Sequence, residues 1–325
     1  MNKNINVLSL FSGVGAFECA LENLKIKYNL IGFSEINKYA IKVYNNLHNE
    51  GSNKNLGDIK NINIEKLPKN IDIIFHGSPC QDFSIAGNNK GGDKGSETRS
   101  SLMWYTVDII KHCKPKYIIW ENVKNVISKK HKHNFDKYLK ELEYLGYTNY
   151  YQVLNSKDYN IPQNRERIFV ISIKEGPLFK FPNKEKLTNK IIDFIDNKVD
   201  EKYYIKDDKI EKNYKINNYK KPIANKIIDV ERVPLKFLNR NGKKTGNDYI
   251  FCIDTCNTGG IKEFYNDGFR IRRLTPYECF KFQGFNENQI NIIKNCNISH
   301  TQLYILAGNT ITVKVIEKIL KNLLQ

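Results

Sequence analysis

The chain has 325 residues, 40% of them hydrophobic and 27% charged, so it can bury a large core in one or two domains and is not a disordered protein. Its formal net charge of +17 favours a polyanionic partner, with nucleic acid as the first candidate. Lysine also accumulates without a function in chains as rich in Asn, Lys and Ile as this one, so charge alone leaves both interpretations open.

The cysteines and the apolar runs indicate the compartment. Seven cysteines, an odd number without the spacing of a disulfide framework, fit a reducing cytosol. Cys252 and Cys256 are four residues apart, but no second pair or nearby histidine completes a zinc set, so we expect no metal. No apolar run approaches the roughly 18 residues of a membrane span, and residues 1–4 do not have the shape of a signal peptide. We therefore expect a cytoplasmic protein without membrane association.

Short β-branched runs alternate with amphipathic stretches through the first half of the chain. In chain order, the pattern predicts a strand at Ile5–Leu10, a helix at Ala16–Leu24, a strand at Leu30–Ser34, a helix at Asn37–Leu47, a strand at Ile71–His76, a helix at Leu102–His112, a strand at Tyr117–Trp120, a helix at Phe135–Leu145, and strands at Tyr151–Leu154 and Arg167–Ile173. Strands that alternate with helices are typical of an α/β fold with a mostly parallel sheet.

The pattern changes near Lys174. Residues 175–270 are rich in Lys, Asn, Tyr and Asp, with irregular apolar runs and no repeat. A weakly ordered insertion is one interpretation, but aromatic residues occur throughout, which favours a smaller, loop-rich domain. An apolar stripe from Val315 to Leu324 predicts a closing helix that covers the first domain's sheet. We expect a catalytic and cofactor-binding domain of residues 1–176 plus 301–325, and a second domain of residues 177–300.

The first predicted strand leads into a turn that contains Gly13 and Gly15, where the backbone can approach a ligand closely. Glu35 ends the second strand, a position where an acid commonly binds ribose hydroxyls. The third glycine of a dinucleotide fingerprint is replaced by Glu18, which favours a ribose-bearing cofactor without a pyrophosphate, such as S-adenosylmethionine. Asp58 follows the next segment and can accept from an adenine amino group. The alternative is that the glycines serve only a tight turn.

Cys80 follows the predicted strand Ile71–His76, within the run Ser78-Pro79-Cys80-Gln81. A thiol at a strand exit is placed to act as a nucleophile, because proximity to arginine or a helix N-terminus increases the thiolate fraction. A lone cysteine is more often a buried core residue, but its neighbours here are polar. Residues 85–100, which are rich in glycine and basic side chains, look like a mobile basic lid beside Cys80.

A carboxyl group and two guanidinium groups occur near other predicted strand ends. Glu121 follows the apolar run 117–120, where partial desolvation suits a proton donor near neutral pH; a surface cap is the alternative. Arg165 and Arg167 precede the strand that ends at Ile173, and alternate residues face one way, so both can point into one site. The alternative for this pair is a solvated surface role.

Six motifs, in order, resemble the cytosine-C5 DNA methyltransferases of restriction-modification systems and phages. They are Phe-x-Gly-x-Gly at residues 11–15, Pro-Cys-Gln at 79–81, Glu-Asn-Val at 121–123, Gln-x-Arg-x-Arg at 163–167, Arg-x-Leu-Thr-x-x-Glu-x-x-x-x-Gln-Gly-Phe at 272–285, and Gly-Asn-Thr-Ile at 308–311. The similarity covers nearly the whole chain except about residues 174–270, where the family keeps its variable target-recognition region.

The resemblance implies a Rossmann-like S-adenosylmethionine-dependent methyltransferase domain, a target-recognition domain and double-stranded DNA as substrate. It implies that Cys80 attacks C6 of a flipped-out cytosine, so that C5 can take the methyl group before loss of the C5 proton expels the thiolate. Glu121 would hold the N3 edge and exocyclic amine, while Arg165 and Arg167 orient the base. The residues implied for cofactor contacts are Phe11, Gly13, Gly15, Glu35, Ile36, Asp58, Ile59, Ser78, Leu102, Asn309 and Ile311. A monomer that protects DNA from a cognate restriction endonuclease is the expected setting.

Some positions depart from the family pattern. Ile36 stands where Trp is frequent, so the adenine would be sandwiched less tightly, and Ser78 replaces a commoner Phe, Gly or Pro. Asn286 follows the Gln-Gly-Phe element instead of Pro. The Thr-Leu hallmark of the recognition region is unclear, with residues 255–260 as a candidate equivalent. None of these positions belongs to the reacting groups.

Three rival functions are considered. An RNA cytosine-C5 methyltransferase of the tRNA-aspartate type shares the catalytic set, but its Cys-Phe-Thr element reads Cys279-Phe280-Lys281 here. An amino-group methyltransferase needs an Asp/Asn/Ser-Pro-Pro-Tyr/Phe run, which the chain lacks. A catalytically silent DNA-binding regulator is hard to reconcile with a complete set of reacting residues.

Overall fold

The computed structural model describes residues 4–49, 52–79, 99–204, 248–250, 252–253, 264–266 and 271–324. The chain forms two compact units. The first contains Met1–Asn155, Glu166–Lys184 and Ile311–Gln325, and the second contains Ser156–Arg165 and Glu185–Thr310. Cys80, nearly all of the predicted basic lid and the predicted hallmark at residues 255–260 lie outside the described residues.

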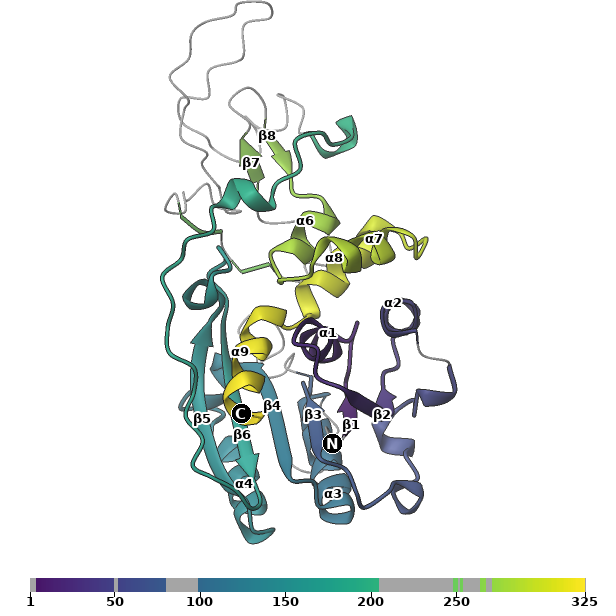
Figure 1. The fold of residues 1–325 in the computed structure, drawn as a ribbon, viewed down its shortest axis with the longest axis vertical. Helices are drawn as coiled ribbons and strands as arrows, with labels where there is room; N and C mark the ends of the chain where they lie inside the picture. Colours follow the sequence, from purple (N-terminus) through teal and green to yellow (C-terminus); the bar gives the residue numbers. More distant parts are fainter. Residues whose placement is uncertain are drawn as a thin grey trace, which may run out of the picture. The chain divides into compact units, whose positions relative to one another are not determined.

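The first unit is built on a six-stranded sheet (Figure 1). Its strands are β1 (Ile5–Leu10), β2 (Tyr28–Ser34), β3 (Ile73–His76), β4 (Tyr117–Val123), β5 (Thr148–Asn155) and β6 (Glu166–Ile173). They lie in the order β2-β1-β3-β4-β6-β5. The pairs β1–β2, β1–β3 and β3–β4 are parallel, and β6 runs antiparallel to β4 and β5.

The prediction of an α/β fold is confirmed, but the sheet is more mixed than expected. Only residues 156–165 separate β5 from β6, and they contain one 3₁₀ turn, η6 (Ser156–Tyr159). A parallel pair needs a crossover of about a dozen residues or more, usually helical, so a connection this short favours antiparallel pairing.

Helices cover both faces of this sheet. They are α1 (Ala16–Asn23), α2 (Lys38–His48), α3 (Met103–Cys113), α4 (Lys132–Tyr144) and α9 (Val313–Leu324). One core cluster joins α3 and α4 to alternate strand residues such as Leu8, Ile74 and Trp120. On the opposite face, Phe17 of α1 stacks on Phe75 of β3 at 4.5 Å, and α9 lies against α1. The predicted closing helix is therefore present and packs against the first helix (Figure 1).

The second unit contains three helices that the sequence patterns did not predict. They are α6 (Pro276–Lys281), α7 (Glu287–Lys294) and α8 (His300–Asn309), and β7 (Phe264–Asn266) pairs antiparallel with β8 (Ile271–Arg273). Two capping boxes, Thr275 with Glu278 and Asn286 with Gln289, start α6 and α7. These Ser/Thr/Asn-x-x-Glu/Gln spacings were the local signal that could have revealed both helices.

A buried ion pair fixes the start of α6. Both nitrogens Nη1 and Nη2 of Arg272 donate to the Glu278 carboxylate, at 2.9 and 2.7 Å, and both side chains are fully enclosed. Glu278 also accepts from the backbone N–H of Thr275 and of Asp196. Four donors on one carboxylate meet its hydrogen-bonding capacity, as a charge inside a protein requires.

The remaining regular elements are short 3₁₀ turns: η1 (Ser52–Lys54), η2 (Ile59–Asn61), η3 (Ile64–Lys66), η4 (Arg99–Leu102), η5 (Lys124–Ile127), η7 (Ile191–Phe194) and η8 (Glu201–Tyr203). No helix in the described part of the chain combines the length and the apolar character needed to cross a membrane.

Candidate active site

The carboxyl ends of the four neighbouring parallel strands carry most of the residues singled out from the sequence. Phe11 follows β1, Glu35 follows β2, and Gly77 and Ser78 follow β3. Glu121 lies near the carboxyl end of β4. Ligands of open α/β sheets bind outside this edge, so the strand order brings the predicted residues to the expected place.

The two glycines of the β1–α1 turn meet different needs. Gly13 has a φ of +57°, and a Cβ built on it would meet no atom within 4 Å, so the backbone there faces open space. Gly15 has a φ of +85°, and a Cβ there would collide with the His48 ring. The open space at Gly13 fits a ligand that approaches the main chain, whereas Gly15 is required by internal packing.

Glu35 holds the glycine turn and the start of α2 together. Its carboxylate accepts from the backbone N–H of Gly13 at 2.9 Å and from those of Ile36 and Asn37 at 2.8 Å each. Asn37 in turn caps α2 by accepting from Tyr39 and Ala40. A carboxylate has room for about four hydrogen bonds, so Glu35 keeps capacity for a hydroxyl donor while it is fixed in place.

The neighbouring predicted cofactor residues differ in exposure. Ile36 is 72% exposed, so its apolar side chain is accessible to a ligand. Asp58 accepts from the Lys60 backbone N–H at 3.0 Å and starts η2, and the side chain of Ile59 belongs to the core, which leaves only its main chain for a ligand. Leu102 at the end of η4 is partly buried against the same core.

The segment that leads towards Cys80 is fastened to β4. The indole N–H of Trp120 donates to Ser78 Oγ at 3.1 Å, and the Asn122 amide donates to the Ser78 carbonyl at 3.2 Å. A Cβ built on Gly77 would lie 3.7 Å from Glu121 Oε2 and 3.6 Å from Cδ1 of Ile311, so these two predicted site residues flank the β3 exit. The role of Trp120 had no signal in the sequence beyond its place in an apolar run.

Glu121 forms an ion pair with Arg167. The guanidinium Nε lies 3.2 Å from Glu121 Oε1, and the side chains are 19% and 11% exposed. The antiparallel register of β4 and β6 produces this contact, because Glu121 pairs with Phe169 and Arg167 is its diagonal neighbour. β4 continues three residues beyond its predicted end, so Glu121 projects from a paired strand and not from a loop.

Arg165 belongs to the second unit, where main-chain carbonyls surround it. Its guanidinium donates to the carbonyls of Ile253 at 2.9 Å, Gly308 at 3.0 Å and Thr310 at 2.7 Å, and the side chain is buried. This guanidinium therefore joins three separate segments of that unit. Asn309, the last residue of α8, is exposed beside one of them.

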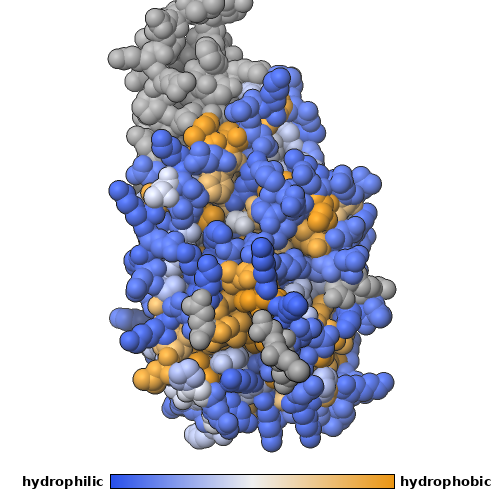
Figure 2. Space-filling view, viewed as in Figure 1, coloured by the Kyte–Doolittle hydropathy of each residue, from blue (hydrophilic) through white to orange (hydrophobic). Residues whose placement is uncertain are grey.

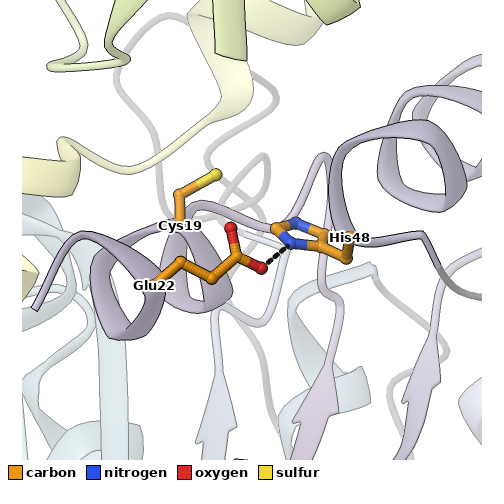
Figure 3. A group of neighbouring side chains, drawn as sticks. All are labelled: Cys19, Glu22 and His48. Carbon is orange, nitrogen blue, oxygen red and sulfur yellow. Dashed lines mark hydrogen bonds and ion pairs between the residues drawn. The ribbon is translucent and has the colours of Figure 1, made fainter. Parts of the chain in front are cut away.

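Cys19, Glu22 and His48 form a further cluster, shown in Figure 3, and the His48 ring lies against Gly15. Their side-chain sulfur, oxygen and nitrogen atoms lie within 4.8 Å of one another, a spacing that would admit a metal ion. However, His48 Nδ1 already lies 2.7 Å from Glu22 Oε1, and burial raises the pKa of the Cys19 thiol well above its usual value. We therefore assign no metal to this cluster.

The family is decided by comparison with known proteins. The sequence model of the family described as C-5 cytosine-specific DNA methylase matches residues 5–325. The chain belongs to this family. It is therefore a DNA (cytosine-5-)-methyltransferase, and the identification from six motifs is confirmed.

Relatives within the family include bacterial and phage enzymes. The type II methyltransferase M2.ScrFI of Lactococcus lactis subsp. cremoris is 38% identical over 288 residues, 83% of this chain and 71% of its own length. The type II methyltransferase M.Bsp6I of Bacillus sp. is 32% identical over 98% of both chains. The orphan methyltransferase M.SPRI of Bacillus phage SPR is 30% identical over 98% of this chain and 97% of its own.

Solved structures share the fold of this methylase. A methyltransferase of Entamoeba histolytica superposes with a TM-score of 0.76 at 22% identity, over 99% of this chain and 98% of that one. The S. pombe Dnmt2 methyltransferase superposes with a TM-score of 0.72 at 18% identity, over 98% and 99%. At these identities the likeness shows the fold alone.

Proposed function

We propose that this methyltransferase modifies C5 of a cytosine that is flipped out of a specific short duplex sequence, as a type II or orphan enzyme. The observation that carries the proposal is the Glu121–Arg167 ion pair at the carboxyl edge of β4, beside the Ser78–Pro79 segment that leads to Cys80. Type II and phage orphan methyltransferases among the relatives support the same conclusion.

Cys80 would act as the nucleophile of a covalent mechanism. Its thiolate forms a bond to C6 of the cytosine, and the electron pair of the C5–C6 double bond moves to C5, which becomes nucleophilic. After C5 has gained the methyl group, a base removes the C5 proton, the double bond re-forms and the C6–sulfur bond breaks. Expulsion of the thiolate regenerates Cys80, and the base releases the C5 proton to solvent before the next turnover.

Glu121 would hold the Watson–Crick edge of the extruded base. Its carboxyl group accepts from the exocyclic amine and supports protonation at N3, which draws electrons from C6 and assists the attack. Arg167 fixes the carboxylate through the 3.2 Å contact, whereas Arg165 holds the main chain of the second unit through the carbonyls of Ile253 and Gly308. Extrusion of a base from the duplex costs a few kcal/mol, which contacts of this kind offset.

The residues at the ends of β1 and β2 fit S-adenosylmethionine, which would supply the methyl group. The open space over Gly13 admits a ligand against the main chain, Glu35 keeps acceptor capacity for ribose hydroxyls, and Ile36 presents an exposed apolar side chain to a flat ring. Asp58 lies in the segment after β2, where it can accept from an adenine amino group. Gly15, Ile59, Ser78, Leu102, Asn309 and Ile311, with Phe11, complete the proposed set.

The test is methyl transfer from labelled S-adenosylmethionine to duplex DNA, with transfer RNA as the competing substrate. We expect label in DNA for the wild type, none for Cys80→Ser, and retained DNA binding by that variant. Cys113→Ser, which changes a buried thiol at the end of α3, is the matched control and should stay active. Substantial turnover by Cys80→Ser would refute the mechanism.

Other outcomes distinguish the rivals. Labelling of transfer RNA in preference to DNA would establish the RNA enzyme instead, and absence of transfer by wild type and variant alike would indicate a silent regulator. Expression in a methylation-free host, followed by mapping of modified cytosines, would give the target sequence. We expect the enzyme to act as a monomer in the cytoplasm, and a restriction endonuclease with the same target sequence would be its cognate partner.

A further inference from the structure

The His48 ring occupies the space that a side chain at position 15 would need. Figure 3 shows this ring pointing towards Glu22 of α1. The ring has no exposed area, and it meets the Tyr44 ring edge-on at 4.7 Å between centroids. His48 ends α2, whereas Gly15 precedes α1, so the contact joins two residues that are 33 positions apart in the chain.

Glu22 holds this ring from the side. His48 Nδ1 lies 2.7 Å from Glu22 Oε1, and the same oxygen accepts from the Tyr28 hydroxyl at 3.0 Å. Burial disfavours a charge on His48, but the hydrogen bond to Glu22 and the negative charges of Glu18 and Glu22 together outweigh it and raise the pKa of the ring. The carboxyl end of a helix also favours a cation, and His48 lies in the last turn of α2.

α2 is thus connected to the glycine turn at both ends. At its start, Glu35 accepts from the Gly13 backbone N–H and from the Asn37 N–H that precedes the helix. At its end, His48 bears on Gly15. A shift of α2 would therefore move both glycines. It would also move the main chain of the turn, which faces open space at Gly13.

We propose that His48, held by Glu22, is a positioning residue of the cofactor site: its ring sets the conformation of the glycine turn that receives S-adenosylmethionine. This inference rests on the proposed function. His48 would not touch the cofactor or the cytosine, so it should govern cofactor affinity and leave the chemical step nearly unchanged.

The first experiment separates binding from turnover. Isothermal titration of wild-type protein with S-adenosylmethionine is compared with His48→Ala and with Glu22→Gln, which keeps the ring but weakens its support. We expect the dissociation constant to rise about ten- to hundredfold for His48→Ala and less for Glu22→Gln, because a displacement of about 1 Å has effects of this size. At saturating cofactor, kcat should stay within about threefold of wild type.

His112→Ala is the matched control. His112 also lies near a glutamate of the same unit, with Nδ1 3.8 Å from Glu65 Oε1, but it contacts the Leu67 carbonyl and not the glycine turn. We expect its cofactor affinity to equal that of wild type. Melting curves of all variants verify that they are folded.

The second experiment uses Gly15→Ala. An alanine there is strained by its positive φ and collides with the His48 ring, so this variant alone should bind cofactor poorly. In the double variant with His48→Ala the collision is removed, and the affinity should partly recover. If the ring did not press on the turn, the two losses would be independent and would add.

Three results would overturn the inference. One is unchanged cofactor affinity in a folded His48→Ala protein, another is a loss of kcat with unchanged affinity, and the third is simple addition of the two losses in the double variant. Failure of the wild type to bind S-adenosylmethionine would instead refute the proposed function on which the inference rests.

Discussion

The structure predicts that two arginines separated by one residue do different work. Arg165→Met removes a buried guanidinium and leaves the carbonyls of Ile253, Gly308 and Thr310 without that donor. A hydrogen bond from a charged donor contributes about 1.5–3 kcal/mol, although three such terms on one group do not add fully. We therefore expect the second unit to lose about 3–5 kcal/mol of stability, less than the sum of three such hydrogen bonds.

Arg167→Met should instead impair the reaction. The Arg167 side chain is partly exposed, and its side-chain partner is Glu121, on which the extruded cytosine would depend. A partly exposed ion pair contributes only about 1 kcal/mol to stability. Removal of a preorganised charged donor beside the reacting group lowers kcat by about 10²–10³-fold. Arg165→Met should thus be mainly a stability defect and Arg167→Met mainly a rate defect.

Spectroscopy and hydrogen exchange can show which of the two units a substitution destabilises. Both tryptophans, Trp104 and Trp120, lie in the first unit, so their fluorescence reports urea unfolding of that unit, while circular dichroism reports both. Hydrogen exchange measured on peptides that contain residues 303–310 reports the segment that Arg165 holds. We expect faster exchange there for Arg165→Met and no change for Arg167→Met.

Arg165→Lys is the control for charge. An ammonium group keeps the charge but cannot reproduce the fork that meets several carbonyls, so this variant should recover little stability. The reasoning is refuted if Arg165→Met keeps the wild-type unfolding midpoint and the wild-type exchange rates yet loses activity as Arg167→Met does. Arg165 would then act on the substrate and not through the main chain.

Three more predictions follow from the charges of the molecule. His76 is buried against the Tyr138 hydroxyl, and burial lowers its pKa to about 3. Below about pH 6.5 the unfolded chain binds a proton at this ring and the folded chain does not, so stability should fall by up to about 1.4 kcal/mol per pH unit as the pH drops towards about 3. The urea midpoint of His76→Phe should depend less on pH than that of the wild type. Arg272→Met should lower stability by about 3–5 kcal/mol, because it leaves the Glu278 charge buried without its partner. In thermal unfolding, the double variant Arg272→Met/Glu278→Leu should recover part of this loss, and no recovery would contradict the burial of the pair. With a formal charge of +17, non-specific DNA binding measured by fluorescence anisotropy should weaken by about a thousandfold or more between about 50 and 200 mM salt, and a flat response would remove charge from the argument.

The elements of the first unit could be predicted from periodicity, because each strand or helix buries a regular pattern of its own. Residues Ile5–Leu10 were predicted with the bounds that the structure has, and α1 and α2 differ by one residue at their ends. β4 was predicted three residues too short, since Glu121 and Asn122 are polar and ended the apolar run. Pairing with β6 continues through them, and a pairing partner is not visible in local sequence.

The candidate site shows the same limit. Glu35 and Glu121 could be placed at strand ends because each follows an apolar run in the chain. His48 could not be connected to Gly15, because the two meet only when α2 packs back against the start of α1. The antiparallel position of β6 next to β4 was also beyond the pattern, although it is what brings Arg167 to Glu121.

The Ser78 contacts explain why the reacting groups would keep a fixed geometry. Trp120 and Asn122 hold Ser78 from β4, and Glu121 projects from the same strand between them. Three consecutive residues of β4, Trp120 to Asn122, therefore fix both the Ser78 segment and the Glu121 carboxyl group. Alternation along a strand places Glu121 on the face opposite to Trp120 and Asn122, so one face of β4 fixes the segment while the other carries the carboxyl group. Ser78, which stands where the family commonly has Phe, Gly or Pro, accepts from the buried Trp120 indole and so satisfies a donor in the core.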